Sequence, residues 1–427
     1  MSQWLDSTLL QAEVVKDDLL PKRQRSLELL RQAKKPGRKN EAWKYTSING
    51  LDAIGSASEA ANNSLKIDSE YLATIPDLES IDLVFVDGKF DISLSTSDLP
   101  AGLIVNSLNN IDSESKQWVT ENFSNIKPEK HFFGLLNDVL AKEGALIRVR
   151  DGVVIEKVIR IIHILSKGVK AHTRILVQVG EAAGLKVIEQ FLGSELSFNT
   201  GFAEYELCKN GQLEHYRLAL QTGDALSIGG SHFKLHERSQ LNSTLVGFGS
   251  NLSRIDVDVR HCGEFANAEI NAIYLLDGKE LFDLHSTIEH EVANCTTEEN
   301  VRGIVADRAR AVFNGRIHIH RYAQKTLAEL NNRNLLLSSK AEVDTKPELE
   351  IYADDVKCAH GATIAEIDQK ALYYLLSRGI DKNKALEMLN FGFINELLDN
   401  IPNQHVADWL RPQLRKRFSA MTPEHAG

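Results

Sequence analysis

The stretch Arg316-Ile317-His318-Ile319-His320-Arg321 alternates apolar and polar residues without interruption. Successive side chains of an extended strand point to opposite faces, so the stretch predicts a strand with both isoleucines facing inward and both histidines facing outward. Two histidines on one face can bind a metal ion. A solvated row of polar side chains on a strand is several times commoner, and we take it as the better interpretation.

Strand-like runs of this kind follow one another from Ala145 for about 200 residues, with little helical pattern between them. Those runs are 153–164, 173–179, 185–191, 203–207, 213–220, 232–236, 241–247, 255–259, 270–276, 281–288, 316–321 and 349–352. The expected turns are Asp151-Gly152, Asn210-Gly211, Gly229-Gly230, Asp277-Gly278 and Asn314-Gly315. So many short strands exceed what one sandwich or closed barrel holds, whereas coils of a β-helix stack without limit. The pattern therefore predicts a mainly β fold built as a β-helix, with two small sandwiches as the alternative.

Helical periodicity flanks this core on both sides. Residues 1–140 are predicted to be mostly helical with a small hairpin at 81–92, residues 141–366 to form the β core, and residues 367–427 to form a C-terminal helical region. In the last region Asp368 and Asp381 are expected to cap two helices, the second ending at Phe391. A third helical segment is expected to carry Ile394, Leu397 and Leu398, and a fourth covers 404–418.

Composition excludes several classes of protein. The chain has 427 residues, of which 43% are hydrophobic and 25% charged, as in an ordinary globular protein. Its 49 basic and 59 acidic residues give a net charge of −10, which argues against binding nucleic acid through phosphate contacts. No apolar run is long enough for a membrane span, and the first residues lack the pattern of a signal peptide. Four widely spaced cysteines with no CxxC pair indicate a reducing cytoplasm.

Common catalytic motifs are missing from the sequence. There is no GxxxxGK[ST] phosphate loop, so the chain is not expected to hydrolyse ATP. There is also no GxGxxG after a strand, no HExxH and no GxSxG. The sequence thus gives no sign of an enzyme.

The segment Val356-Lys357-Cys358-Ala359-His360-Gly361-Ala362-Thr363 carries the strongest candidate site. In a strand Cys358 and His360 point the same way, with Cβ atoms roughly 6–7 Å apart. A thiol and an imidazole together suit a soft metal or an iron–sulfur fragment. The ordinary alternative is a core cysteine, since buried cysteine is common. The neighbouring Asp354 and Asp355 are better explained as turn residues than as ligands.

Several multi-residue blocks, in order, resemble the SufB/SufD scaffold proteins of iron–sulfur cluster assembly. The blocks are Arg308-Ala309-Arg310-Ala311-Val312-Phe313-Asn314-Gly315-Arg316-Ile317, Ala323-Gln324-Lys325-Thr326, Asn334-Leu335-Leu336-Leu337-Ser338, Ala341-Glu342-Val343-Asp344-Thr345-Lys346-Pro347-Glu348-Leu349-Glu350-Ile351, His360-Gly361-Ala362-Thr363 and Tyr374-Leu375-Leu376-Ser377-Arg378-Gly379-Ile380. Residues 41–46, Glu-Ala-Trp-Lys-Tyr-Thr, resemble an N-terminal element of the SufD branch. The segment 357–363 also looks like SufD, because SufB typically carries His-Glu-Ala-Thr there.

The resemblance implies a right-handed parallel β-helix flanked by N-terminal and C-terminal helical regions. It implies a non-enzymatic subunit in a complex with SufB and two copies of the ATPase SufC. SufB would pair with the end of the β-helix, where Cys358 and His360 would help to hold a transient iron–sulfur cluster, with no permanently bound cofactor. SufC would dock on the C-terminal helices. The residues expected there are Leu386, Leu389, Phe391, Phe393, Leu397 and Leu398.

Further expectations concern the surface meant for SufB and the rival functions. An isolated chain could form a homodimer through that surface, because an uncapped β-helix end exposes edge backbone. A β-helix enzyme acting on polysaccharide would need a groove of carboxylates and aromatics, and the aromatic content of 7% counts against it. A third possibility is a purely architectural partner in which Cys358 and His360 are buried and inert.

Overall fold

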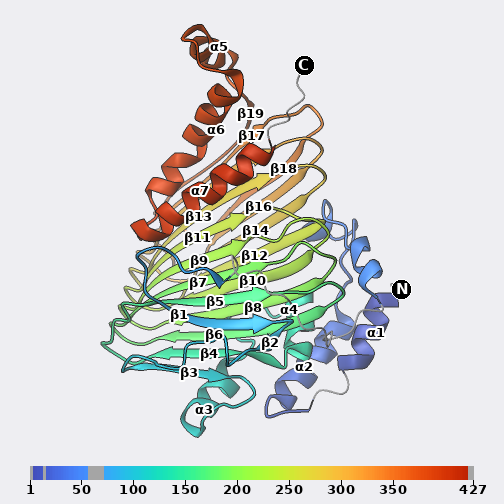
Figure 1. Ribbon diagram of the computed structural model, residues 1–427. Coiled ribbons are helices and arrows are strands. Elements are labelled where there is room, and N and C mark those ends of the chain that lie inside the picture. The colour runs from blue at the N-terminus through green and yellow to red at the C-terminus, as the bar shows by residue number, and fades with distance from the viewer. Residues whose placement is uncertain (1–2, 13–15, 56–71, 422–427) are drawn as a thin grey trace.

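A parallel β-helix forms the centre of the molecule, with helices at both ends of the chain (Figure 1). This computed structural model describes residues 3–12, 16–55 and 72–421. From β4 onward consecutive strands alternate between two sheets, so that each coil gives one strand to each sheet. The predicted fold class, a mainly β protein with a parallel β-helix between helical regions, is confirmed.

Two sheets make the walls of the β-helix. In spatial order the first contains β19 (Lys357–Glu366), β17 (Leu327–Leu336), β15 (Thr296–Val305), β13 (Asn267–Leu276), β11 (Gln240–Gly247), β9 (Gln212–Ala219), β7 (Gly184–Leu192), β5 (Val158–Ile164), β1 (Ser80–Val86) and β2 (Lys89–Phe90). The second contains β18 (Glu342–Ile351), β16 (Arg310–Ile319), β14 (Leu281–His290), β12 (Leu252–His261), β10 (Leu226–Leu235), β8 (Phe198–Leu207), β6 (Lys170–Val179), β4 (Glu143–Val149) and β3 (Leu103–Ser107). β1 and β2 are antiparallel, which confirms the predicted hairpin.

Inward side chains of successive coils stack into columns because the parallel strands pair in register. In β16, Ile317 and Ile319 are fully buried in the core, as the alternation predicts. His318 and, just beyond the end of the strand, His320 remain partly exposed. Burial of each aliphatic side chain stabilises the fold by about 1.5–3 kcal/mol relative to leaving it exposed. The columns together form one continuous core along the axis of the β-helix.

Two of the predicted turns are wrong. Gly229-Gly230 lies inside β10 and Asn314-Gly315 inside β16. A Cβ atom at Gly229 would lie 2.2 Å from the carbonyl oxygen of Gly201, and one at Gly315 would lie 2.6 Å from Leu330 Cδ1. These glycines are needed for close packing rather than for a turn. The other three predicted turns do connect strands.

The C-terminal helices are α5 (Gln369–Ser377), α6 (Lys382–Asp399) and α7 (Gln404–Met421). Asp368 and Asp381 cap α5 and α6 as predicted, each accepting hydrogen bonds from two backbone N–H groups. The predicted break after Phe391 is wrong, since α6 continues through Gly392. Its apolar side chains pack on the first sheet both before and after that glycine, and this packing holds the helix together. α6 and α7 lie along the sheet from β7 to β17.

Helices of the N-terminal region cover the second sheet (Figure 1). They are α1 (Gln3–Ala12), α2 (Leu20–Gln32), the 3-10 turns η1 (Glu41–Trp43) and η2 (Asn49–Ile54), α3 (Ser113–Asn122) and α4 (Phe132–Leu140). Trp43 is buried, and the Arg254 guanidinium lies 3.9 Å from the centre of its ring. Arg254 also pairs with Asp256 at 2.8 Å and Asp283 at 3.0 Å. The residues around Trp43 thus anchor this region to the β-helix.

One corner of the β-helix repeats a left-handed backbone conformation in successive coils. The residues with positive φ there are Gly152, Ala182, Asn210, Arg238, Phe265, Asn294 and Lys325. The N–H of Ala182 donates to the carbonyl of Lys209 at 2.9 Å, and that of Asn210 donates to Glu237 at 2.9 Å. The corner therefore ties each coil to the next, at a backbone cost for every residue that is not glycine.

Replacement of Ala182 by glycine is expected to stabilise the fold. Glycine removes a left-handed penalty of about 1–2 kcal/mol and adds an unfolded-state entropy cost of about 0.4–1 kcal/mol, for a net gain of roughly 0.5–1 kcal/mol. Ala183→Gly is the control, because Ala183 is buried and has no positive φ. Urea unfolding measures both variants. Equal destabilisation by the two substitutions would contradict this view of the corner.

Candidate functional site

The C-terminal end of the β-helix is an uncovered coil. β18 and β19 are the outermost strands of the two sheets, and no other described strand pairs with their free edges. The side chains of β18 and β19 are all half-buried or exposed. In an inner strand such as β16, fully buried side chains alternate with half-buried ones. Tyr352 is 62% exposed and Ile364 is 47% exposed. Edge strands without a partner offer free backbone groups that another chain can pair with.

Cys358 and His360 lie on this last coil. Cys358 pairs in register with Ala328, and His360 pairs with Leu330. Both partners are fully buried in the core, so the two candidate residues occupy the inward-facing positions of β19. Cys358 packs against the core and is partly exposed, and His360 is exposed because no further coil lies over it in the described chain. The two side chains share one face, as the alternation predicted.

The surroundings of Cys358 favour its protonated form. Burial raises the pKa of Cys358 above its ordinary value. The thiol therefore remains protonated at neutral pH until a metal ion or a basic group takes its proton, since only the thiolate is a good ligand.

The described residues offer no third potential ligand close to both Cys358 and His360. Among residues 3–12, 16–55 and 72–421, no group of three potential metal ligands includes Cys358 or His360. Asp354 and Asp355 lie in the bend between β18 and β19, as expected of turn residues. The backbone N–H of Asp355 donates to the side-chain oxygen of Gln324 at 2.8 Å. A metal or cluster that needs four ligands must therefore find the others outside the described chain.

Glu299 lies two coils below His360, and sequence reasoning missed it. The register stacks His360 on Leu330 and Leu330 on Glu299. The Glu299 carboxylate is completely buried, and burial raises its pKa to about 7, although the Ser286 side chain acts in the opposite direction. The parity of Thr297, Glu299 and Val301 could have revealed this inward acid, but residues 296–305 are too polar to be recognised as a strand.

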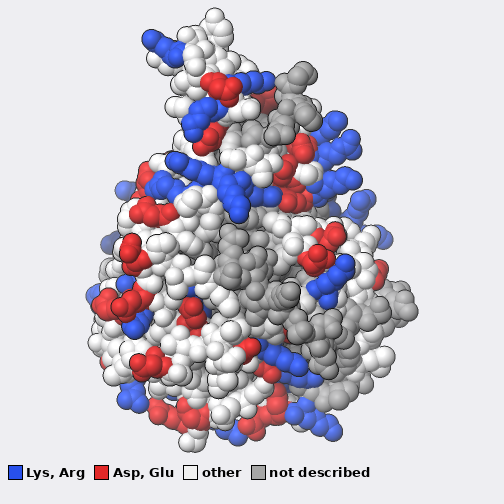
Figure 2. All heavy atoms as spheres, in the orientation of Figure 1, with Lys and Arg blue, Asp and Glu red and all other residues white. Residues whose placement is uncertain are grey.

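The predicted partner-binding residues of α6 do not share one environment. Phe391, Leu397 and Leu398 are buried against the first sheet, and Phe393 packs at the edge of the same cluster. Leu386 and Leu389 are half-buried. The exposed apolar side chains of this region are others, namely Tyr373, Tyr374, Leu376 and Met388. In Figure 2 the tip formed by α5 is largely uncharged, and basic side chains form a band below it at the level of α7.

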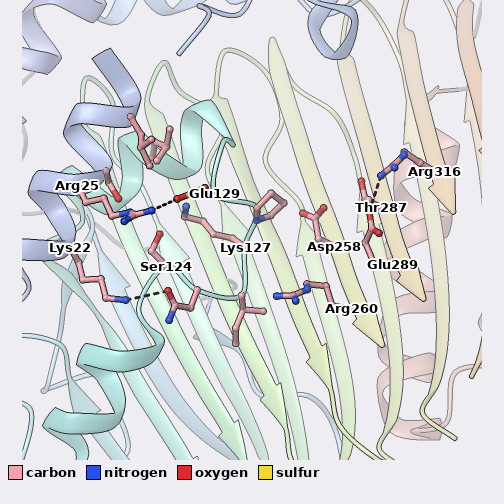
Figure 3. Close-up of a pocket in the computed structure, with 16 residues that line it drawn as sticks. Lys22, Arg25, Ser124, Lys127, Glu129, Asp258, Arg260, Thr287, Glu289 and Arg316 are labelled. Carbon is pink, nitrogen blue, oxygen red and sulfur yellow. Dashed lines mark hydrogen bonds and ion pairs between the residues drawn. The ribbon is translucent and has the colours of Figure 1, made fainter. Parts of the chain in front are cut away.

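A groove of about 790 Å³ between α2 and the second sheet is not a promising site (Figure 3). Its cations are bonded to neighbours inside the groove or beneath it. Arg25 pairs with Glu129 at 2.6 Å, and Arg316 pairs with Glu289 at 2.9 Å. Paired charges leave little attraction for an ionic ligand. The groove is better explained as part of the contact between the N-terminal region and the β-helix.

These features define a class: a parallel β-helix protein in which no other described strand pairs with the C-terminal coil. No helix in the described ranges is both long and apolar enough to cross a membrane.

Comparisons with known proteins identify the family. Residues 163–393 match the model described as "SUF system FeS cluster assembly, SufBD core domain", and residues 8–161 match the "SufBD protein N-terminal region". The chain is 31% identical to the iron–sulfur cluster assembly protein SufD of Escherichia coli, over 98% of this chain and 96% of that protein. It is 30% identical to the SufBD family protein slr0076 of Synechocystis, over 90% and 88% of the two chains.

Another relative is the chloroplastic protein ABCI7 of Arabidopsis thaliana, at 27% identity over 92% of this chain and 85% of that protein. The chain belongs to the SufB/SufD family of iron–sulfur cluster assembly proteins and is SufD-like. The resemblance seen in the sequence is thereby confirmed.

Substitution of Glu299 by glutamine is expected to flatten the dependence of stability on pH. The folded pKa of about 7 lies above the ordinary value of 4.5, so the folded state binds more protons and loses stability as pH rises through 4.5 to 7. The loss at pH 8 is up to roughly 3 kcal/mol. Denaturant unfolding at pH 5 and pH 8 should show Glu299→Gln gaining on the unaltered chain at pH 8. The substitution of the exposed Glu298 by glutamine is the control, and parallel pH profiles for all three proteins would refute the assignment.

Proposed function

We propose that this chain is a non-catalytic scaffold subunit that assembles iron–sulfur clusters together with SufB and the ATPase SufC. The observation that carries the proposal is an incomplete ligand pair, Cys358 and His360, on an uncovered coil of the β-helix. Family membership supplies the cargo, since the matched family model is described by iron–sulfur cluster assembly.

The free edges of β18 and β19 favour a SufB partner that continues the β-structure. A second edge would satisfy the unpaired backbone groups and cover the exposed side chains of Tyr352 and Ile364. The same contact would bring ligands from SufB to the nascent cluster beside Cys358 and His360. Binding of iron would displace the Cys358 proton, and His360 would contribute a neutral imidazole nitrogen.

The tip around α5 favours SufC as its occupant. Tyr373, Tyr374, Leu376 and Met388 form an exposed apolar group of the kind that is enriched in protein interfaces. Phe391, Leu397 and Leu398 would act indirectly, by fixing α6 on the first sheet. ATP-driven closure of two SufC copies would then pull on α5 and α6 and open the coil that carries the ligand pair.

Substitution of His360 by alanine is expected to leave the complex intact and abolish most of its cluster. The complex would be purified anaerobically with SufB and SufC, and iron and sulfide would be quantified per complex. His405→Ala is the matched control, because His405 is exposed on α7. Equal iron and sulfide in all three complexes would make this subunit purely architectural.

The double substitution of Tyr373 and Tyr374 by alanine is expected to weaken SufC binding at least tenfold without affecting SufB, since exposed tyrosines of an interface often carry much of its affinity. Isothermal titration with each partner measures this. Ile92→Ala, at an exposed residue far along the chain, is the control.

The buried Phe391 gives the contrasting case. Phe391→Ala should lower the free energy of unfolding by about 3–5 kcal/mol because it leaves a cavity under α6. Unchanged SufC affinity in the tyrosine variant would place the docking surface elsewhere.

A further inference from the structure

Two histidines interrupt an aliphatic column inside the β-helix. The register stacks inward residues at the ends of eight strands of the second sheet. In order they are Val149, Val179, Leu207, Leu235, His261, His290, Ile319 and Ile351. Six coils thus place an aliphatic side chain where two adjacent coils place an imidazole. His261 and His290 are both completely buried, so their presence there needs a reason other than solvation.

A thiol lies beside the two rings. One nitrogen of His261, one nitrogen of His290 and the sulfur of Cys295 all lie within 4.8 Å of one another. Cys295 is completely buried as well. The imidazole rings are stacked, with their centres 4.4 Å apart and their planes 6° apart. Two imidazole nitrogens and one sulfur thus lie together in one buried place, and each of these atoms can be a metal ligand.

Hydrogen bonding satisfies the thiol but not the two rings, since Cys295 Sγ donates to the carbonyl oxygen of Gly263 at 3.3 Å. The Thr297 hydroxyl lies 2.9 Å from His261 Nε2 and 3.1 Å from His290 Nε2. A hydroxyl has one proton, so it can donate to one ring and accept from the other. The Nδ1 atoms of both rings are buried and have no partner among the described residues. The cluster therefore contains two buried nitrogen atoms without a hydrogen-bond partner among the described residues, which is costly unless a ligand binds them.

We propose that His261, His290 and Cys295 form a transition-metal site inside the β-helix. Two imidazole nitrogens and one thiolate suit a borderline-soft divalent ion such as Zn²⁺, Fe²⁺ or Co²⁺. Binding breaks the S–H bond of Cys295 and releases that proton to solvent, with no change in oxidation state. The ligand atoms would have to approach one another by up to about 1.5 Å to reach tetrahedral spacing. The site is separate from Cys358 and His360 and does not rest on the proposed function.

The position of the cluster relates it to the open end. Thr297 pairs in register with Ala328, and Ala328 pairs with Cys358. A single small side chain thus lies between the Cys358 position and the hydroxyl that bridges the two histidines.

The outer cluster of Glu289, His318 and His320 meets the same distance criterion and serves as a control. Its carboxylate already accepts from both histidines, at 2.6 Å and 2.8 Å, and pairs with Arg316 at 2.9 Å. A guanidinium bonded to the same carboxylate disfavours a cation there. His318→Ala should therefore leave metal binding unchanged.

The test uses the full chain produced in minimal medium with added Co²⁺ and purified anaerobically. We expect one cobalt per chain with thiolate-to-cobalt charge-transfer absorption. Cys295→Ser should abolish that absorption, whereas Cys262→Ser, Cys358→Ser and His318→Ala should retain it. Circular dichroism and thermal unfolding establish that each variant is folded.

Two further variants guard against misfolding of the cysteine variant. His261→Leu and His290→Ile introduce the residues that neighbouring coils carry in the same column, so both variants should fold. The amount of cobalt bound per chain should fall at least tenfold in both. A folded chain without cobalt, absorption that survives Cys295→Ser, or absorption that only Cys358→Ser removes would each overturn the proposal.

Discussion

The in-register parallel pairing of strands governs this molecule. About 29 residues separate Asn267 from its partner Thr296, and every residue of β13 keeps the same offset to β15. The backbone hydrogen bonds of each coil therefore fix which side chain of the next coil lies above it. Apolar columns, the glycines inside β10 and β16, and the polar groups in the interior all follow from this pairing. A shift by one residue would turn every inward side chain outward.

The pairing also explains what the sequence could and could not reveal. A run such as Arg316 to Arg321 predicts a strand because its apolar and polar residues alternate, which gives the strand one apolar face and one polar face. β15 and β17 carry Thr, Glu, Asn and Arg at many positions, so their strands went unrecognised. Their inward residues become apparent only when each is stacked on a neighbour already known to face the core. The corner was predicted only where it carries turn residues, at Gly152 and Asn210, and not at Ala182, Phe265 or Lys325, which are not residues that mark a turn.

The candidate site divides along the same line. Cys358 and His360 could be paired from the sequence because their relation is local, two residues apart on one strand. The surroundings of Glu299 and the pairing of His261 with His290 depend on contacts between residues about 30 positions apart, for which a single sequence carries no signal. The exposed tyrosines of α5 were missed for another reason: helical periodicity locates an apolar stripe but does not say which stripe the sheet covers.

The packing of α6 and α7 along the first sheet has a mechanical consequence. A plain solenoid behaves as a row of nearest neighbours, in which each coil can come apart almost independently. Here α6 and α7 pack across the first sheet from β7 to β17 and connect coils that do not touch each other. The interior coils should therefore open together. The coil of β18 and β19 has one neighbour and a free edge, and it is the natural point at which fraying begins. The candidate residues Cys358 and His360 thus lie on the coil that is expected to separate from the β-helix most readily.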